Sequence, residues 1–434
     1  MIVLKHWQTV YRHKLISAAE AAQKVKSGDR VVIGHACGEP KALVQALTAR
    51  HHELCNVEIT HMVAMGESPY AQPGMEGSFR HNALFVGRST RKAVEEGRAD
   101  YTPCFFSEIP RLFKEKILPV QVALLQITPP DEHGFCSYGI SADYTVAAAQ
   151  SADLVIAQVN RRMPRTQGAR IHLNHLDFLV EQDEELVELP PVQIGETERK
   201  IGRYIAEMVP DGATLQLGIG AIPDAVLLFL QDKKDLGIHS EMFSDGVVDL
   251  VNQGVITNRR KTQNPNAFVA TFLMGTRKLY DFVDNNPQVQ LHPVDYVNNP
   301  YVIGKHDLMI SINSALQVDL MGQVNAEVIN SKQFSGIGGQ VDFIRGASRS
   351  AGGKSIIALP ATAAQGTVSR IVAGLDHGAV VSTSRNDVQY VVTEYGIANL
   401  RGKTLRQRAD AMIEIAHPDF RKILREEANT KGLL

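Results

Sequence analysis

The sequence predicts an α/β protein made of two tandem open, mostly parallel α/β domains. Two observations lead to this prediction. Short β-branched and apolar runs alternate along the chain with helical stretches and glycine-containing loops, which is typical of parallel sheets covered by helices. The succession of helix, turn, strand, glycine loop, helix and strand also occurs twice, and Gly28/Gly212 and Gly34/Gly218 share an offset of 184 residues. Such a repeat indicates a duplicated unit.

The first copy starts with a helix that Ser17 can cap and that ends at Ser27-Gly28. A strand, a helix started by Pro40 and a second strand follow, and further buried strands come later in this half. We predict helices at 18–25 and 39–47, and strands at 30–34, 57–62, 84–86, 122–127 and 153–159.

The domain boundary is expected within 181–194, an acid-rich segment that contains two adjacent prolines. This gives an N-terminal domain at 1–188 and a C-terminal domain at 195–434. For the second copy we predict helices at 196–208 and 223–230, and strands at 214–217, 237–242, 308–313, 355–359 and 388–393. Ligands of open α/β sheets bind beyond the carboxyl ends of the strands, so the glycine loops mark the candidate site.

Composition excludes several classes of protein. A formal net charge of -2 argues against a general nucleic-acid surface, which has a basic excess. The four cysteines are far apart and form no CxxC or Cys/His cluster, so we expect reduced thiols rather than a zinc site or a disulfide framework. Residues 1–7 lack the apolar core of a signal peptide, and no apolar run approaches the roughly 20 residues of a membrane span. We therefore expect a soluble, cytoplasmic protein.

The chemistry is expected in the stretch 237–246, where Glu241 lies in a turn that contains serine and glycine. The loop 216–220 follows the preceding strand, and its backbone amides could hold an oxyanion while the carboxylate attacks a carbonyl carbon. The repeat places Met62 opposite Glu241, so only the second copy carries the acid. Two alternatives remain open: an acid in such a turn is often only a cap or solvated, and Glu394, which also ends a strand, is a rival nucleophile.

The loop 218–220 has a second interpretation, because two glycines followed one strand later by an acid resemble half of a dinucleotide-binding fingerprint. Pro223 replaces the third glycine, and the acid lies in a turn, so NAD binding is disfavoured. A third interpretation is that the glycines serve only a tight turn between strand and helix.

A second glycine loop, 336–339, is followed by Gln340 and by three cations: Arg345, Arg349 and Lys354. Backbone amides and cations together favour an elongated anionic ligand that carries phosphates. The alternative is a solvated basic loop. A P-loop is excluded because no GxxxxGK[ST] occurs.

The absence of other catalytic motifs narrows the chemistry that the sequence can support. The sequence has no GxSxG elbow, and no histidine lies near a cysteine in a way that suggests an activated thiol. A carboxylate is ionised at neutral pH without a partner base, and it can attack a target that is already activated, such as a thioester. Attack would give an acyl anhydride and a thiolate, which then returns to the glutamyl carbonyl without any proton transfer.

Four motifs together resemble the acetyl-CoA hydrolase/transferase family, and within it the 4-hydroxybutyrate and butyryl-CoA:acetate CoA-transferases. They are 216–220 (QLGIG), 240–246 (SEMFSDG), 336–343 (GIGGQVDF) and 393–402 (TEYGIANLRG), and the resemblance covers essentially the whole chain. It implies two domains of the CoA-transferase, or ribose-phosphate-isomerase-like, type, a homodimer, and a glutamyl-CoA thioester on Glu241. The residues implied to contact CoA or form the oxyanion hole are Gln216, Leu217, Gly218, Ile219, Gly220, Leu316, Gly338, Gly339, Gln340 and Lys354. Ser335 stands where related members have Asn, which puts a CoA contact there in doubt.

The resemblance implies a CoA-transferase that moves CoA from an acyl-CoA, with acetyl-CoA as the expected donor, to an acid such as 4-hydroxybutyrate or butyrate. CoA and acyl-CoA are substrates, with no permanently bound cofactor and no metal. The partners implied are acyl-CoA and short carboxylates, without nucleic acid or membrane. The alternatives are an acetyl-CoA hydrolase, in which water replaces the second acid, and a non-catalytic CoA or nucleotide sensor on the same fold.

Overall fold

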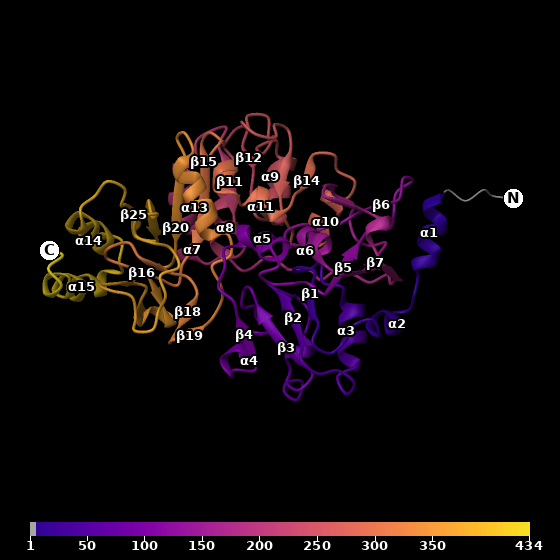
Figure 1. Ribbon diagram of the computed structural model, residues 1–434. Coiled ribbons are helices and arrows are strands. Elements are labelled where there is room, and N and C mark those ends of the chain that lie inside the picture. Colours follow the sequence, from indigo (N-terminus) through magenta and orange to yellow (C-terminus); the bar gives the residue numbers. More distant parts are fainter. Residues whose placement is uncertain (1–5) are drawn as a thin grey trace. The chain divides into compact units, whose positions relative to one another are not determined.

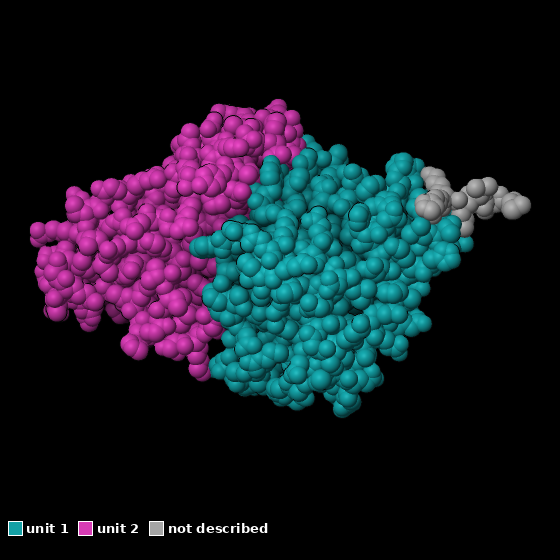
Figure 2. Space-filling model, in the orientation of Figure 1, with its two compact units in different colours: residues 1–189, 269–296 teal, residues 190–268, 297–434 magenta. Residues whose placement is uncertain are grey.

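The computed structural model describes residues 6–434, so part of the N-terminal segment considered for a signal peptide lies outside the described residues. The chain forms two compact units, shown in different colours in Figure 2. Unit 1 contains the residues up to 189 and the segment 269–296, and unit 2 contains 190–268 and 297–434. The predicted domains were two consecutive stretches, whereas the structure assigns 269–296 to the first unit. No helix within 6–434 is long and apolar enough to cross a membrane.

Unit 1 is organised around a parallel sheet (Figure 1), which confirms the predicted fold class for this half. Within the described residues the sheet has seven strands, all paired in parallel. Their order is β10 (Phe178–Glu181), β7 (Leu154–Val159), β5 (Val122–Ile127), β1 (Arg30–Ile33), β2 (Val57–His61), β3 (Phe79–Ala83) and β4 (Ala99–Tyr101).

The helices of unit 1 include α2, which has the capping box expected of its sequence. Ser17 Oγ accepts a hydrogen bond from Glu20 N, and the Glu20 carboxylate accepts one from Ser17 N. The α-helices are α1 (His6–Lys14), α2 (Ala18–Ala22), α3 (Lys41–Ala49), α4 (Arg91–Glu95), α5 (Ile109–Lys114), α6 (Thr145–Ser151) and α10 (Arg277–Val283). Smaller sheets contain β6 (Phe135–Ser137) with β9 (Arg170–His172), and β13 (Phe268–Ala270), β14 (Val289–Leu291) and β8 (Gln167–Gly168).

The strand predicted at 84–86 is wrong, because the strand in this region is β3, which ends at Ala83. Its sequence, FRHNA, looks too polar for a buried strand. The polar groups are satisfied across the sheet, since His81 Nδ1 lies 2.8 Å from the Ile59 carbonyl oxygen and Asn82 Nδ2 donates to Glu58 Oε1. The sequence pattern does not predict these partners, because they lie on the neighbouring strand.

Unit 2 has a second sheet, mostly parallel, which confirms the predicted fold class for this half as well. The described residues give it six strands, of which only the last pair is antiparallel. The order is β12 (Gly237–Ile238), β11 (Thr214–Leu217), β15 (Met309–Ser314), β20 (Lys354–Ala358), β24 (Tyr390–Thr393) and β25 (Gly396–Asn399).

The helices of unit 2 pack with this sheet and with the short strands that follow β15. They are α7 (Glu196–Met208), α8 (Ala221–Leu228), α9 (Asp245–Asn252), α12 (Pro300–Ile303), α13 (Gln340–Arg349), α14 (Leu405–Glu414) and α15 (Pro418–Thr430). The boundary between unit 1 and unit 2 falls within α11 (Val294–Val297). The short strands are β16 (Gln317–Asp319), β17 (Val324–Asn325), β18 (Val328–Ile329), β19 (Lys332–Gln333), β21 (Thr362–Ala363), β22 (Val368–Ser369) and β23 (Ile371–Val372). One core cluster joins the later strands to α14 and α15 through residues such as Val391, Met412 and Leu424.

The internal repeat predicted from the sequence is confirmed in the topology. In unit 1, β1 lies between β2 and β5, and in unit 2, β11 lies between β12 and β15. The strands next in line, β7 and β20, also occupy matching places. Gly28 and Gly212 both have positive φ, 85° and 76°, in the turn before β1 and β11. The duplication therefore extends to the turns that introduce the strands.

Candidate active site

Glu241 lies shortly after β12, at the carboxyl end of the unit 2 sheet. The predicted strand 237–242 stops at Ile238, and Met242 returns as an isolated antiparallel bridge to Leu217. Ser240 reinforces this bridge, because its hydroxyl accepts from Leu217 N at 3.2 Å and donates to the Leu217 carbonyl oxygen at 3.1 Å. The end of β11 is thus tied to the residue before Glu241.

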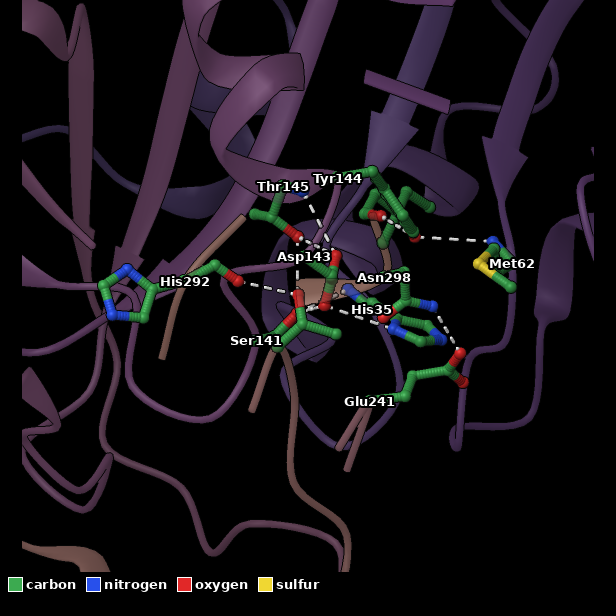
Figure 3. Close-up of polar contacts among 11 residues, drawn as sticks. His35, Met62, Ser141, Asp143, Tyr144, Thr145, Glu241, His292 and Asn298 are labelled. Carbon is green, nitrogen blue, oxygen red and sulfur yellow. Dashed lines mark hydrogen bonds and ion pairs between the residues drawn. The ribbon is translucent and has the colours of Figure 1, made fainter. Parts of the chain in front are cut away.

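The Glu241 carboxylate is held by a buried amide. Asn298 Nδ2 donates to Glu241 Oε2 at 2.8 Å, as the dashed line in Figure 3 shows, and Asn298 is fully buried. Gly339, the residue before α13, packs against the same two groups: a Cβ at this position would collide with Glu241 Oε2 and Asn298 Nδ2. A larger residue at 339 would therefore displace the Glu241 carboxylate and the Asn298 amide.

His239 fixes the segment that carries Asn298. Its Nε2 lies 2.8 Å from the carbonyl oxygen of Val297, and the ring is fully buried. His239 therefore has a structural role, because it anchors the backbone next to Asn298. It links the strand that leads to Glu241 with the residue next to Asn298.

The first glycine loop follows β11 directly. Gly220 has a φ of 107°, in a region that favours glycine, and it precedes α8. Ile219 is 40% exposed and Gly218 has space around its Cα, so the backbone between β11 and α8 is accessible. Because Leu217 bonds to Ser240, this loop and Glu241 belong to one site at the carboxyl ends of β11 and β12.

This site can be compared with known proteins. The model of the acetyl-CoA hydrolase/transferase N-terminal domain matches residues 3–191, and that of the C-terminal domain of the same family matches residues 275–428. The chain belongs to the acetyl-CoA hydrolase/transferase family. It is an enzyme of the CoA-transferase class.

Relatives of this family match almost the full length of the chain. The 4-hydroxybutyrate coenzyme A transferase of Clostridium kluyveri is 61% identical over 422 residues, covering 97% of this chain and 98% of that protein. The succinyl-CoA:cyclohexane-1-carboxylate CoA transferase of Geobacter metallireducens is 46% identical over 98% of this chain and 97% of its own. The crystal structure of 4-hydroxybutyrate CoA-transferase from Porphyromonas gingivalis has a TM-score of 0.85 at 45% identity, covering 98% of this chain and 100% of that one.

Two glutamines that the family resemblance assigned to CoA have side chains engaged inside unit 2. The Gln216 side chain accepts from Ser311 Oγ at 2.6 Å and donates to the Ile312 carbonyl oxygen, so it joins β11 to β15. Gln340 donates to the Ser314 carbonyl oxygen and accepts from Thr383 Oγ1. These side-chain amides therefore support the loops on either side of the sheet's carboxyl end.

The remaining candidates lie at different edges of the sheet. Leu316 follows β15 at the carboxyl end and is half-buried, and Gly338 has a φ of 54° just before Gly339. Lys354 is the first residue of β20, at the opposite, amino end, where its Nζ donates to the Met208 carbonyl oxygen at 2.6 Å. The structure does not bring Lys354 together with the other candidates.

The rival nucleophile, Glu394, has a structural contact. Its Oε2 accepts a hydrogen bond from Ala361 N at 2.8 Å, which ties the end of β24 to the loop after β20. This bond gives the Glu394 carboxylate a structural role at the end of β24.

Lys261 contacts the strand that leads to Glu241. Its buried Nζ donates to the carbonyl oxygens of Ile238 and Ala267. Burial lowers the pKa of Lys261 to about 7. No sequence pattern pointed to this lysine, because its partners are backbone groups.

Unit 1 contains a buried polar cluster that the sequence analysis did not single out (Figure 3). His35 Nδ1 lies 3.2 Å from Asp143 Oδ2, and Ser141 Oγ donates to the same oxygen at 2.9 Å. Tyr144 OH donates to the Ile33 carbonyl oxygen, at the end of β1. Within unit 1 these bonds fix the loop after β1, the counterpart of the loop after β11.

Proposed function

We propose that this member of the acetyl-CoA hydrolase/transferase family moves CoA from a short acyl-CoA to a short-chain carboxylic acid. Acetyl-CoA is the expected donor, and 4-hydroxybutyrate or butyrate the expected acceptor. The reaction passes through a covalent thioester between CoA and the carboxyl group of Glu241. The observation that carries the proposal is the carboxylate of Glu241, held 2.8 Å from Asn298 Nδ2 and packed directly against Gly339.

The chemistry in each half of the reaction needs no proton transfer. A Glu241 oxygen attacks the carbonyl carbon of the acyl-CoA, the C–S bond breaks, and CoA leaves as the thiolate. The thiolate then attacks the glutamyl carbon of the mixed anhydride and expels the original acid as a carboxylate. The acceptor carboxylate repeats both steps in reverse and leaves as the new acyl-CoA. Atoms and charge balance at each step.

Asn298 has two tasks in this scheme. Before reaction its N–H group orients the carboxylate. When the thiolate or the second carboxylate attacks the glutamyl carbon, negative charge develops on the glutamyl oxygen, and the same N–H donates to it. A buried donor is worth more there than one in water, because the local dielectric constant is low.

Backbone amides supply the remaining contacts to CoA in this proposal. The glycine loop 218–220 and the glycines 338 and 339 would contribute main-chain N–H groups at the carboxyl end of the sheet, and Leu316 would add an apolar contact. We further propose that the enzyme works as a cytoplasmic homodimer without nucleic-acid or membrane partners; light scattering of the purified protein tests the dimer.

Intact-mass measurement tests the thioester. Incubation with acetyl-CoA alone should add the mass of CoA minus water to the chain, and added acetate should remove it. The adduct should map to the peptide that contains Glu241 and should not form in Glu241→Gln. An adduct that persists in this variant would move the nucleophile elsewhere, with Glu394→Gln as the next variant.

The same experiment separates the alternatives. If no adduct forms and CoA is released at a rate that is independent of the carboxylate concentration, the protein is a hydrolase. Binding of CoA with neither adduct nor turnover, unchanged in Glu241→Ala, would indicate a sensor. For a transferase, kcat/KM measured with acetate, butyrate and 4-hydroxybutyrate identifies the acceptor; the name of the 61% identical relative supports 4-hydroxybutyrate.

A further inference from the structure

A basic pocket lies in unit 2, away from Glu241. It has a volume of about 420 Å³, within the range of small-molecule sites. Four arginines line it, Arg345, Arg349, Arg401 and Arg408, and the single acidic residue among its lining residues is Asp387. The pocket lining therefore carries a formal charge of +3, although the whole chain carries -2.

The pocket lies at the opposite edge of the sheet from the thioester chemistry. Its lining comes from the last turns of α13, from the residues just before β24, from those just after β25, which returns antiparallel to β24, and from the first turn of α14. These are the amino ends of the parallel strands. Gly339 and Glu241 lie at the other end of α13, and ten residues of helix at 1.5 Å each separate Gly339 from Arg349 by about 15 Å. The sequence had grouped the glycine loop with Arg345 and Arg349, but the helix separates them.

Most of the guanidinium charge in the pocket is uncompensated. Arg345 pairs with Asp387 at 3.3 Å. Among the described residues, Arg349, Arg401 and Arg408 have no carboxylate within ion-pair distance: Arg349 lies over the Tyr301 ring at 4.7 Å, Arg401 donates to the Ser348 carbonyl oxygen, and Arg408 donates to backbone carbonyl oxygens. These contacts orient the arginines without neutralising them.

Like charges that line one pocket repel each other, and an anion between them relieves this repulsion. Burial lowers the pKa of Arg408, and Arg385, which lies outside the pocket lining, lowers it further. A guanidinium presents a fork of N–H donors that matches phosphate oxygens in a bidentate way. A monocarboxylate would offset one of the three charges, whereas a diphosphate group offers several charged oxygens within one pocket.

We propose that this pocket binds a small anion that carries two or more linked phosphate groups, at a site separate from that of Glu241. Inorganic pyrophosphate contains the recognised group alone, and ADP contains the same group with a nucleoside attached. Neither the family membership nor the proposed transfer reaction assigns a ligand to this pocket.

Calorimetric titration with pyrophosphate tests the proposal. We expect binding that weakens at least tenfold in the double variant Arg349→Ala/Arg401→Ala and that falls steeply with added salt. The matched control is Arg203→Ala, which removes another exposed arginine of unit 2 that lies over an aromatic ring, here Phe229 at 5.3 Å. Arg401→Lys should lose part of the affinity, because it keeps the charge and removes the fork. ADP should bind at least as tightly as pyrophosphate.

Three results would overturn the proposal. The pocket is not the binding site if pyrophosphate fails to bind the wild type, or if it binds the double variant as tightly as the wild type. If citrate binds with the same affinity as pyrophosphate, the pocket has no preference for phosphate groups. A dissociation constant for CoA that rises in the double variant along with that for pyrophosphate makes the pocket part of the CoA site. Thermal unfolding of each variant checks folding, and these readouts do not depend on the transfer reaction.

Discussion

At the scale of single residues, two groups determine how Glu241 is presented. Asn298 donates to the carboxylate from a fully buried position, and Gly339 leaves space for both. Neither contact involves a residue that titrates near neutral pH. In the proposed mechanism these two groups contribute by positioning the carboxylate and by donating a hydrogen bond to it.

Asn298→Ala should lower kcat about 100- to 1,000-fold, because it removes a donor to the glutamyl oxygen where charge develops. Single-turnover formation of the CoA adduct should slow by a similar factor. The matched control is Asn299→Ala, whose side chain caps α12 by accepting from Tyr301 N; it should cost about 1 kcal/mol of stability with little change in rate. An Asn298→Ala enzyme with the wild-type rate of adduct formation would remove Asn298 from the mechanism.

Gly339→Ala should also abolish most activity, because the added methyl group collides with Glu241 Oε2 and Asn298 Nδ2. Gly77→Ala is the control, since nothing lies within 4 Å of a Cβ at that position and its φ is not in the left-handed region. Circular dichroism should show both proteins folded, and kcat should fall only for Gly339→Ala. Equal kcat values for Gly339→Ala and Gly77→Ala would show that the site accommodates the methyl group without loss of activity.

At the scale of elements, the position of Glu241 depends on the short length of β12 more than on the pairing of this strand with β11. The strand ends after two residues, and the chain returns to β11 through the Leu217–Met242 bridge. The Ser240 hydroxyl completes this return by bonding both polar backbone groups of Leu217. Glu241 therefore lies in a short arch with both ends attached to β11.

Ser240→Ala should loosen this arch. It leaves a buried N–H group and a buried carbonyl of Leu217 without the hydroxyl, which costs about 1–3 kcal/mol. We expect a lower midpoint of urea unfolding together with a lower kcat. Ser244→Ala, which loses a 3.3 Å contact to Asp224 at a half-buried site, should change both much less. Loss of stability at an unchanged kcat would show that the arch does not position Glu241.

At the scale of the whole molecule, the two units repeat one topology and differ in the residues that come after the second strand of each copy. In unit 1, β2 leads to Met62, and in unit 2, β12 leads to Glu241 and is contacted by the buried amine of Lys261. Burial of this amine makes the stability of unit 2 depend on pH, because the folded chain holds its proton less tightly than the unfolded chain does.

The expected direction is set by the two pKa values. Between the folded pKa of about 7 and the ordinary value of 10.5, the unfolded chain carries a proton that the folded chain lacks, so the free energy of unfolding rises with pH. Relative to Lys261→Met, the wild type should gain about 2 kcal/mol between pH 7.5 and pH 9, at up to about 1.4 kcal/mol per pH unit. Urea unfolding at each pH measures this difference. The exposed Lys234→Met should keep the trend of the wild type, and a wild type without any gain over Lys261→Met would mean that the buried amine stays charged.

Local sequence was sufficient to predict most strands of the two central sheets, their duplication and the position of Glu241. These features rest on local patterns: β5, α7 and β11 begin and end at the predicted residues because apolar period, caps and glycine turns are encoded nearby. Local sequence did not predict β3, β4, β10 and β25. The polar strand β3 was missed because its partners lie on neighbouring strands.

The groups that surround the carboxylate, in contrast, come together only when distant segments of the chain pack. Asn298 is 57 residues from Glu241 in the chain and lies in no recognisable motif, so nothing local indicates that its amide meets the carboxylate. The same reason applies to the Gln216 side chain, whose partner Ser311 lies on β15, and to the arginines that meet at the end of α13. Sequence pattern encodes elements, because their causes lie within a few residues; a site is set by the packing of elements, which brings distant side chains within hydrogen-bond distance.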